Sequence, residues 1–231
     1  MLYPEIIPGD PLAAGGIVVR WILNRPGLLG GDKSYSADDL IFAYDPHFLL
    51  PGVHGETLYI PTCDMSIFNN DDNPHDHVRD LVCFYAHKYL ASGGQLTEHV
   101  KGATSLCKDQ VLTHSQIAGI LRRSKLLYVY EPTALIVEAL LCGCPVSVIQ
   151  TDYWHNNLSN PVFATNVGLV MNDNPESLLH ARATVGNYRD MYENVELKRA
   201  WNHVDHFIDL TQRAVTDRFQ SPKFAIISPA E

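Results

Sequence analysis

The chain has 231 residues, of which 46% are hydrophobic, and it carries a formal net charge of −9 at pH 7. This length and composition are typical of a globular protein with one large domain, or with one complete domain and part of another. The acidic charge and the lack of a long Lys or Arg run argue against nucleic-acid binding, because a phosphate backbone is bound through clustered basic side chains.

The cysteines and the apolar segments bear on the compartment. Five cysteines, an odd number without a disulfide spacing, are typical of a reducing environment. No apolar stretch approaches the roughly 20 residues of a membrane-spanning helix, and Met1 to Glu5 do not resemble the start of a signal peptide. We therefore expect a cytoplasmic protein whose association with a membrane, where it occurs, is peripheral.

The first elements are short. Residues 11–24 begin with Pro11 and stop before a Pro-Gly pair, so the sequence predicts a helix there. The glycine-rich residues 28–32 are expected to form a loop. Two runs of β type follow at 39–44 and 56–60.

The pattern becomes regular in the second third of the chain. A helix is predicted at 114–123, where Ile117, Ile120 and Leu121 share one face, and another at 133–142. Strands are predicted at the apolar runs 80–86, 125–130, 145–149 and 167–171. Alternating strands and helices predict an α/β fold, a Rossmann-like parallel sheet with helices on both faces. From Asn174, a helix cap followed by Pro175, to about Phe219 the pattern is helical.

Glu138 is the only formal charge between Glu131 and Asp152, and it lies within an apolar helix. A carboxylate there is costly to bury unless something donates hydrogen bonds to it, and the vicinal hydroxyls of a ribose are one such donor. The predicted helix also offers the amides of Thr133 and Ala134 to an anion such as a diphosphate. The structural alternative stays open: Thr133 only caps the helix and Glu138 pairs with an internal Arg or with backbone.

Three further groups have both a functional and a structural interpretation. The pair His75 and His77 could bind a metal, but the polar residues before it favour a solvated loop. Cys142 and Cys144 could form a redox or metal pair, but their place between a helix and a buried strand favours packing. The segment 154–157, Trp-His-Asn-Asn, follows a strand and either contacts a ligand or forms a surface loop.

The segment from Tyr128 to Val148 carries a family resemblance. Glu131 in a loop, the helix start at Thr133 and Ala134, and Glu138 precede an Ala-x-x-Cys-Gly-x-Pro-Val motif. This order resembles the donor-binding signature of GT-B glycosyltransferases, especially the retaining, nucleotide-sugar-dependent group found in bacterial polysaccharide assembly. Six residues separate the two glutamates here, whereas seven separate them in that family.

Upstream segments extend the resemblance over most of the chain. Residues 58–68 resemble the family's entry into its C-terminal domain, and 82–88 resemble the first strand of that domain. Residues 19–27 resemble the end of the N-terminal domain.

The resemblance implies roles for six residues. Glu131 would lie near the sugar ring as the catalytic residue. The implied donor-binding residues are Glu138, Thr133, Ala134, Lys88 and Tyr130. Among them Glu138 would bind the ribose, the two amides would hold the diphosphate and Lys88 would neutralise it. The resemblance implies no metal and no cofactor, since the nucleotide-diphosphate sugar is the substrate.

The resemblance also implies a domain division and a function. Residues 1–54 would be a remnant or C-terminal part of an acceptor-side domain, 55–172 a nucleotide-sugar-binding domain, and 173–231 helices packed on that domain. The protein would transfer the sugar of a nucleotide sugar to a glycan or a lipid-linked acceptor. The alternative is a catalytically incomplete nucleotide-sugar-binding or scaffold subunit, because most of the first domain is expected to be absent. Such a subunit would expose apolar surface around 17–23 and pair with a second copy or another protein.

Overall fold

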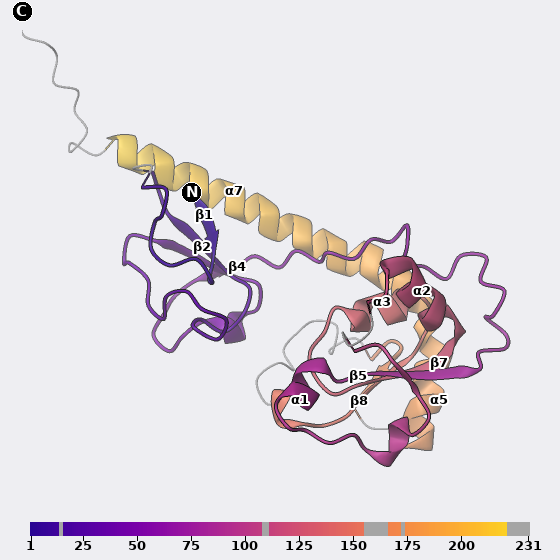
Figure 1. Ribbon diagram of the computed structural model, residues 1–231. Helices are drawn as coiled ribbons and strands as arrows, with labels where there is room; N and C mark the ends of the chain where they lie inside the picture. Colours follow the sequence, from indigo (N-terminus) through magenta and orange to yellow (C-terminus); the bar gives the residue numbers. More distant parts are fainter. Residues whose placement is uncertain (14–15, 108–110, 155–165, 172–173, 221–231) are drawn as a thin grey trace, which may run out of the picture. The chain divides into compact units, whose positions relative to one another are not determined.

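The computed structural model describes residues 1–13, 16–107, 111–154, 166–171 and 174–220. They form two compact units, each with its own parallel sheet and helices (Figure 1). Unit 1 combines Met1–Pro61 with the helix that begins at Leu197, and unit 2 spans Thr62–Glu196. The predicted α/β, Rossmann-like architecture is therefore confirmed.

Unit 1 has a four-stranded sheet in which the strands lie in sequence order and every pair is parallel. Its elements are β1 (Leu2–Pro4), β2 (Val19–Ile22), β3 (Leu40–Ala43), β4 (Glu56–Thr57), the short 3-10 helix η1 (Pro46–Phe48) and α7 (Leu197–Gln220).

Unit 2 has a five-stranded parallel sheet of order β6-β5-β7-β8-β9. Its strands are β5 (Leu81–Tyr85), β6 (Thr104–Ser105), β7 (Ser124–Val129), β8 (Val146–Val148) and β9 (Leu169–Val170). Its α-helices are α1 (His87–Ala91), α2 (His114–Arg123), α3 (Leu135–Leu141), α5 (Pro175–Thr184) and α6 (Tyr188–Met191). Shorter helical turns are η2 (Glu98–Val100), η3 (Asp152–Trp154), η4 (Val185–Asn187) and the π-helix η5 (Tyr192–Glu196).

The central strand β7 explains why the core of unit 2 has two faces. Because side chains alternate along a strand, Leu126, Tyr128 and Tyr130 join one buried cluster, while Leu127 and Val129 are buried on the opposite face. Helix α2 packs against β5 and β7, and α3 packs against β8. Apolar residues on both faces are typical of a parallel sheet covered on both sides.

The core of unit 1 is closed by α7, which is remote in sequence. Val204, Phe207 and Leu210 of α7 pack against the cluster formed by Val19, Phe42 and Leu58, and the rings of Phe42 and Phe207 meet edge to face at 4.9 Å. The described part of the C-terminal segment is thus divided. Its first helices belong to unit 2, and α7 belongs to unit 1 rather than to the nucleotide-sugar-binding domain predicted from sequence.

The helix predicted at 11–24 is wrong, because its second half is strand β2. Ile17, Val18 and Val19 are β-branched, which favours an extended backbone, and β2 gains hydrogen-bonding neighbours on both sides in β1 and β3. The apolar surface expected around 17–23 is also largely absent. Val19 and Ile22 are buried, and Ile17 and Trp21 pack on the cluster that α7 covers.

Most of the remaining predicted elements are confirmed, although the run 56–60 is a strand only at Glu56–Thr57 and the helix predicted at 133–142 spans Leu135–Leu141. The strands predicted at 39–44, 80–86, 145–149 and 167–171 contain β3, β5, β8 and β9, and the strand predicted at 125–130 overlaps β7, which begins one residue earlier. Helix α2 has the predicted bounds and begins with a capping box between Thr113 and Gln116. Asn174 caps α5 by accepting a hydrogen bond from the Ser177 amide.

Candidate functional site

The strand order of unit 2 places a switch point between β5 and β7. From β5 the chain first goes outward to β6, and it then returns to the other side of β5 to form β7. In open parallel sheets, ligands bind beyond the carboxyl ends of the strands at such a reversal. Lys88 lies in α1, which follows β5, and the residues from Tyr130 to Ala134 follow β7, so the topology brings predicted site residues from both segments to one edge.

Contacts between these two segments confirm that they meet. The Tyr89 amide donates a hydrogen bond of 2.6 Å to the Glu131 carboxylate. The rings of Tyr89 and Tyr130 stack with centroids 5.3 Å apart. Lys88, which precedes Tyr89 in α1, is exposed. Helix α1, which carries Lys88, is therefore fixed against the loop that carries Glu131.

Glu131 is fully buried. Its Oε2 accepts the hydrogen bond from the Tyr89 amide, and its Oε1 has no hydrogen-bond partner among the described residues. In this geometry the carboxylate holds the start of α1 and is closed off from solvent. A role for Glu131 at the sugar ring stays a prediction.

Tyr130 is buried as well, and its hydroxyl is engaged. It accepts a hydrogen bond from the Thr97 amide at 3.1 Å and lies 2.6 Å from the Thr97 hydroxyl. These contacts and the stacking on Tyr89 make Tyr130 part of the support beneath the two segments, so its predicted contact with a donor also stays a prediction.

Glu138 differs from Glu131 because its carboxylate makes no hydrogen bond or ion pair within the part of the chain that the structure describes. It is half-buried on α3, where Leu135, Ile136 and Ala139 are buried. Burial raises the pKa of Glu138, and the nearby His114 opposes that rise. The side chain thus combines a desolvation cost with no compensating partner in the described protein.

Two arginines of unit 2, Arg79 and Arg122, lie close enough to influence Cys142, which follows α3. Both donate their hydrogen bonds to groups other than Glu138. Arg79 donates to the Asp76 carboxylate and to the Cys142 carbonyl, and Arg122 donates to the Ile67 and Asn69 carbonyls. The pairing of Glu138 with an internal Arg, which was the structural alternative, is therefore not observed among the described residues.

Thr133 and Ala134 lie directly before α3. The Thr133 hydroxyl accepts a hydrogen bond from the Leu135 amide at 3.3 Å, so this residue does act as a cap. Within the described ranges, the amides of Thr133 and Ala134 donate no hydrogen bond to the protein. Both amides are thus available to an acceptor, as the sequence predicted.

His114 and Cys63 were missed from sequence, although both lie within electrostatic reach of Glu138. His114 opens α2, and its ring lies 5.8 Å from that of Phe68. Burial raises the pKa of Cys63 to about 12, with the Glu138 charge as the next contribution. The only available signal was the position of Cys63 within the segment 58–68 that carries part of the resemblance.

The structure gives the other candidate groups no catalytic geometry. Among the described residues there is no cluster of three or more His, Cys, Asp or Glu that could hold a metal ion. Cys142 and Cys144 are buried free thiols, and burial raises the pKa of Cys142 to about 12. Trp154 is buried, and residues 155–157 of the predicted contact segment lie outside the described residues.

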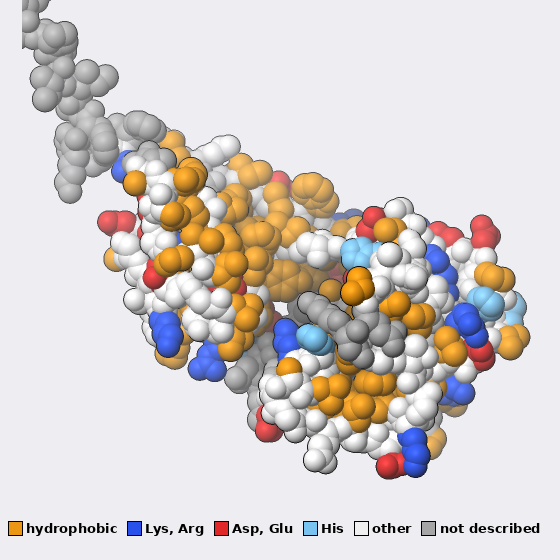
Figure 2. All heavy atoms as spheres, in the orientation of Figure 1, with side chains coloured by type: hydrophobic (Ala, Val, Ile, Leu, Met, Phe, Trp, Pro, Cys, Tyr) orange, Lys and Arg blue, Asp and Glu red, His pale blue; other side chains and the backbone are white. Residues whose placement is uncertain are grey.

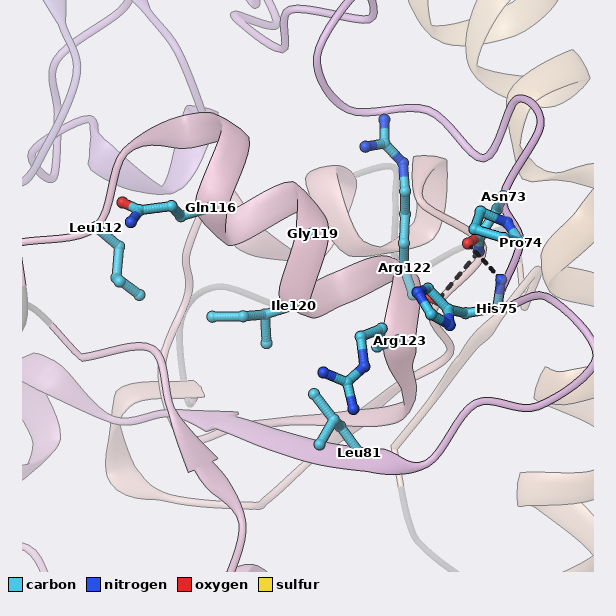
Figure 3. A pocket seen from close by; sticks show the side chains of 10 residues that line it. All are labelled: Asn73, Pro74, His75, Leu81, Leu112, Gln116, Gly119, Ile120, Arg122 and Arg123. Carbon is cyan, nitrogen blue, oxygen red and sulfur yellow. Dashed lines mark hydrogen bonds between the residues drawn. The ribbon is translucent and has the colours of Figure 1, made fainter.

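A cavity of about 540 Å³ lies at the opposite end of the unit 2 sheet (Figure 3). Its walls include Leu81 at the start of β5 and Arg123 at the end of α2, which pairs with Asp80. The Asn73 side chain joins two of its walls through hydrogen bonds to the Arg122 carbonyl and from the His75 amide. Of the candidate residues named from sequence, His75 lines this cavity, and none of the six residues implied by the family resemblance does.

The fold and the site thus define a Rossmann-like α/β protein with a candidate ligand site at a sheet switch point. No protein-family model matches the chain, and no match was found among curated proteins. In the portion of the chain that the structure covers, no helix is both long and apolar enough to cross a membrane.

Proposed function

We propose that unit 2 binds a nucleotide sugar and that the protein is a GT-B glycosyltransferase, which transfers the sugar to a glycan or lipid-linked acceptor. The observation that carries this proposal is Glu138, a half-buried carboxylate with no partner in the described protein, on the helix that follows the switch point. A diol that donates two hydrogen bonds would offset the desolvation of that carboxylate.

The neighbouring groups suit the rest of such a ligand. The free amides of Thr133 and Ala134 precede α3, and Lys88 is exposed on the adjacent helix α1. Amides and a basic side chain stabilise the negative charge that develops on a diphosphate leaving group. This arrangement needs no metal to bind the diphosphate. A second parallel sheet in unit 1 also agrees with the two-domain construction of GT-B enzymes.

The burial of Glu131 favours a second candidate function, a subunit that binds a nucleotide sugar without transferring the sugar. A group can act as a catalytic residue only if it reaches the reacting atoms. Glu131 is fully buried and bonded to the Tyr89 amide, so in this geometry it supports the site instead.

Calorimetric titration with UDP-, GDP- and dTDP-sugars tests the binding. We expect one of them to bind, and we expect Glu138→Ala to weaken that binding by roughly tenfold or more, because hydrogen bonds to a charged acceptor contribute about 1.5–3 kcal/mol. Glu176→Ala is the matched control, since Glu176 lies in the first turn of α5 and outside the proposed site. No heat with any donor, or equal effects of both substitutions, would contradict the proposal.

Release of the nucleoside diphosphate separates the two functions. A transferase releases it from the bound donor faster when an acceptor is added. A binding subunit retains donor affinity but shows no release above the uncatalysed rate with any acceptor or partner protein.

A further inference from the structure

Unit 1 contains a pocket of about 300 Å³ beyond the carboxyl ends of its strands β2 and β3. Most of its wall comes from the loop that joins these strands, and one residue follows β3. The lining residues are Arg25, Pro26, Gly27, Leu28, Lys33 and Leu50. The carboxyl edge of a parallel sheet is where this class of fold places ligands.

Two basic side chains, Arg25 and Lys33, line this pocket, and neither makes a hydrogen bond or ion pair within the described part of the chain. Two acids of unit 1, Asp32 and Glu5, accept hydrogen bonds from backbone amides. Asp32 accepts a hydrogen bond from the Gly9 amide at 2.6 Å, and Glu5 accepts one from the Leu23 amide at 2.9 Å. Neither cation of the pocket thus has an ion-pair partner among the described residues, in a protein whose net charge is −9.

Glycines in the loop fix the position of this charge. Gly27 has φ +77°, and a Cβ added there would lie 2.7 Å from Cγ of Lys33, so the stem of Lys33 lies against the Gly27 backbone. Gly31 has φ +74°, and a Cβ added there would lie 1.9 Å from the Glu5 carbonyl oxygen. Only glycine permits both the backbone conformation and these approaches. The pocket is thus part of the folded loop.

The same loop exposes apolar side chains beside the cations. Leu28 is 62% exposed and Leu29 is 69% exposed. Hydrophobic and basic side chains both reach the surface of unit 1 on the face shown in Figure 2. An anion alone leaves these leucines in water, whereas an anion that carries an apolar chain covers them.

We propose that this pocket binds a phosphate-class anion between Arg25 and Lys33, and that the anion is the headgroup of an amphiphile whose apolar chain lies against Leu28 and Leu29. A phosphate monoester or diphosphate has the charge to pair with two cations at once. The proposal concerns unit 1 only and does not depend on nucleotide-sugar binding by unit 2.

The test compares two probes on the full chain, vesicles of phosphatidylcholine with or without phosphatidic acid, and soluble pyrophosphate. The double substitution Arg25→Gln and Lys33→Gln removes the basic pair. Its control is Arg213→Gln with Lys125→Gln, two exposed cations outside the pocket that also lack a partner among the described residues. Both variants change the net charge equally, and their folding is checked by circular dichroism.

We expect sedimentation with phosphatidic acid vesicles but not with phosphatidylcholine alone. The Arg25 and Lys33 substitutions should weaken this binding by roughly 30-fold, since each basic residue at an anionic surface contributes about fivefold. The control pair should change it by about twofold or less.

A second pair of variants tests the apolar part. Leu28→Ser with Leu29→Ser should weaken vesicle binding by roughly tenfold and leave pyrophosphate binding unchanged. The control is Leu12→Ser with Leu179→Ser, which are similarly exposed, at 62% and 67%.

Three results would overturn the assignment. Equal losses in the pocket and control cation variants would mean that only net charge matters. If neither the vesicles nor pyrophosphate bind, the pocket is not an anion site. Pyrophosphate binding that requires Arg25 and Lys33, with no vesicle binding, would replace the amphiphile by a soluble phosphate compound.

Discussion

The two parallel sheets have the same feature at their carboxyl edges, a buried glutamate that accepts a hydrogen bond from a backbone amide of the neighbouring segment. In unit 1, Glu5 follows β1 and accepts a hydrogen bond from the Leu23 amide, which follows the neighbouring strand β2. In unit 2, Glu131 follows β7 and accepts one from the Tyr89 amide, beyond the neighbouring strand β5. Both glutamates are buried. In each unit a carboxylate therefore ties together two segments at the edge where ligands bind.

The two units differ in the sign of the charged side chains that have no partner among the described residues. Unit 1 leaves two cations, Arg25 and Lys33, without described partners, and unit 2 leaves the carboxylate of Glu138. Fully or partly buried acids that follow the strands therefore have two different roles. The fully buried one accepts a backbone amide and builds the edge, and the half-buried one without a partner is the candidate for ligand contact.

The largest expected effect concerns Arg20, which fixes the loop after β1. Its guanidinium pairs with Asp39 at 2.9 Å and donates to the carbonyls of Ile7 and Gly9, and both charged groups are buried. Arg20→Met should lower the free energy of unfolding of unit 1 by about 3–5 kcal/mol, because it leaves a buried charge unpaired. Arg123→Met, at the exposed pair with Asp80, should cost about 1 kcal/mol or less. Hydrogen exchange resolved by peptide separates the two units, and similar costs would contradict the argument.

The next effect concerns Gly31, where the two loops of unit 1 approach most closely. Gly31→Ala should destabilise unit 1 by about 3 kcal/mol, because its Cβ clashes with the Glu5 carbonyl in addition to the cost of positive φ. Gly52→Ala also has positive φ but meets no atom within 4 Å, so it should cost only about 1 kcal/mol. Urea denaturation measures both, and equal costs would show that the close approach is relieved easily.

Because both units contain such a glutamate, its substitution should lower the free energy of unfolding by a similar amount in each unit. Glu5→Ala and Glu131→Ala should each lower stability by about 2–3 kcal/mol, because each leaves an amide without its acceptor. The loss should be confined to the unit that carries the substitution. Glu→Gln at each position keeps an acceptor and should cost less. Hydrogen exchange at Leu23 and Tyr89 provides the measurement, and unchanged protection of either amide would show that its glutamate does not hold the neighbouring segment in place.

The smallest effect concerns the pH dependence of Glu138. Burial raises its pKa above the ordinary value of 4.5, so the folded state favours the neutral form. The free energy of unfolding should therefore fall as pH rises from below 4.5 through the raised pKa. Glu138→Gln lacks this titration, so it should gain stability relative to the wild type over the same interval. Thermal unfolding of both proteins across that interval measures the difference, and a constant difference would refute the burial argument.

Local patterns predicted much of unit 2. The apolar face formed by Ile117, Ile120 and Leu121 located helix α2, and long apolar runs located β5 and β7. The failure at 11–24 shows the limit of such patterns, since a short apolar run fits a helix and a strand equally well until neighbouring strands are known. Strands of two or three residues, such as β1 and β6, are too short to show a period.

The candidate site was only partly accessible from sequence. Glu138 is conspicuous as a lone charge in an apolar segment, so it was predicted without tertiary information. The bond of Glu131 to Tyr89 joins residues 42 positions apart and depends on the packing of two segments. The pocket at Arg25 and Lys33 depends on the turns at several glycines, whose conformations no single residue pattern specifies.

The covering of the first sheet by α7 has a consequence for biosynthesis. The ribosome completes β1 to β4 early, but Val204 and Phe207, which seal their apolar face, emerge only after all of unit 2 has been made. Domains generally fold as they are synthesised, so unit 2 can fold first. Until α7 has been made, the sheet of unit 1 remains with its hydrophobic face exposed. Chaperone engagement during translation should therefore be concentrated on the earliest part of the chain.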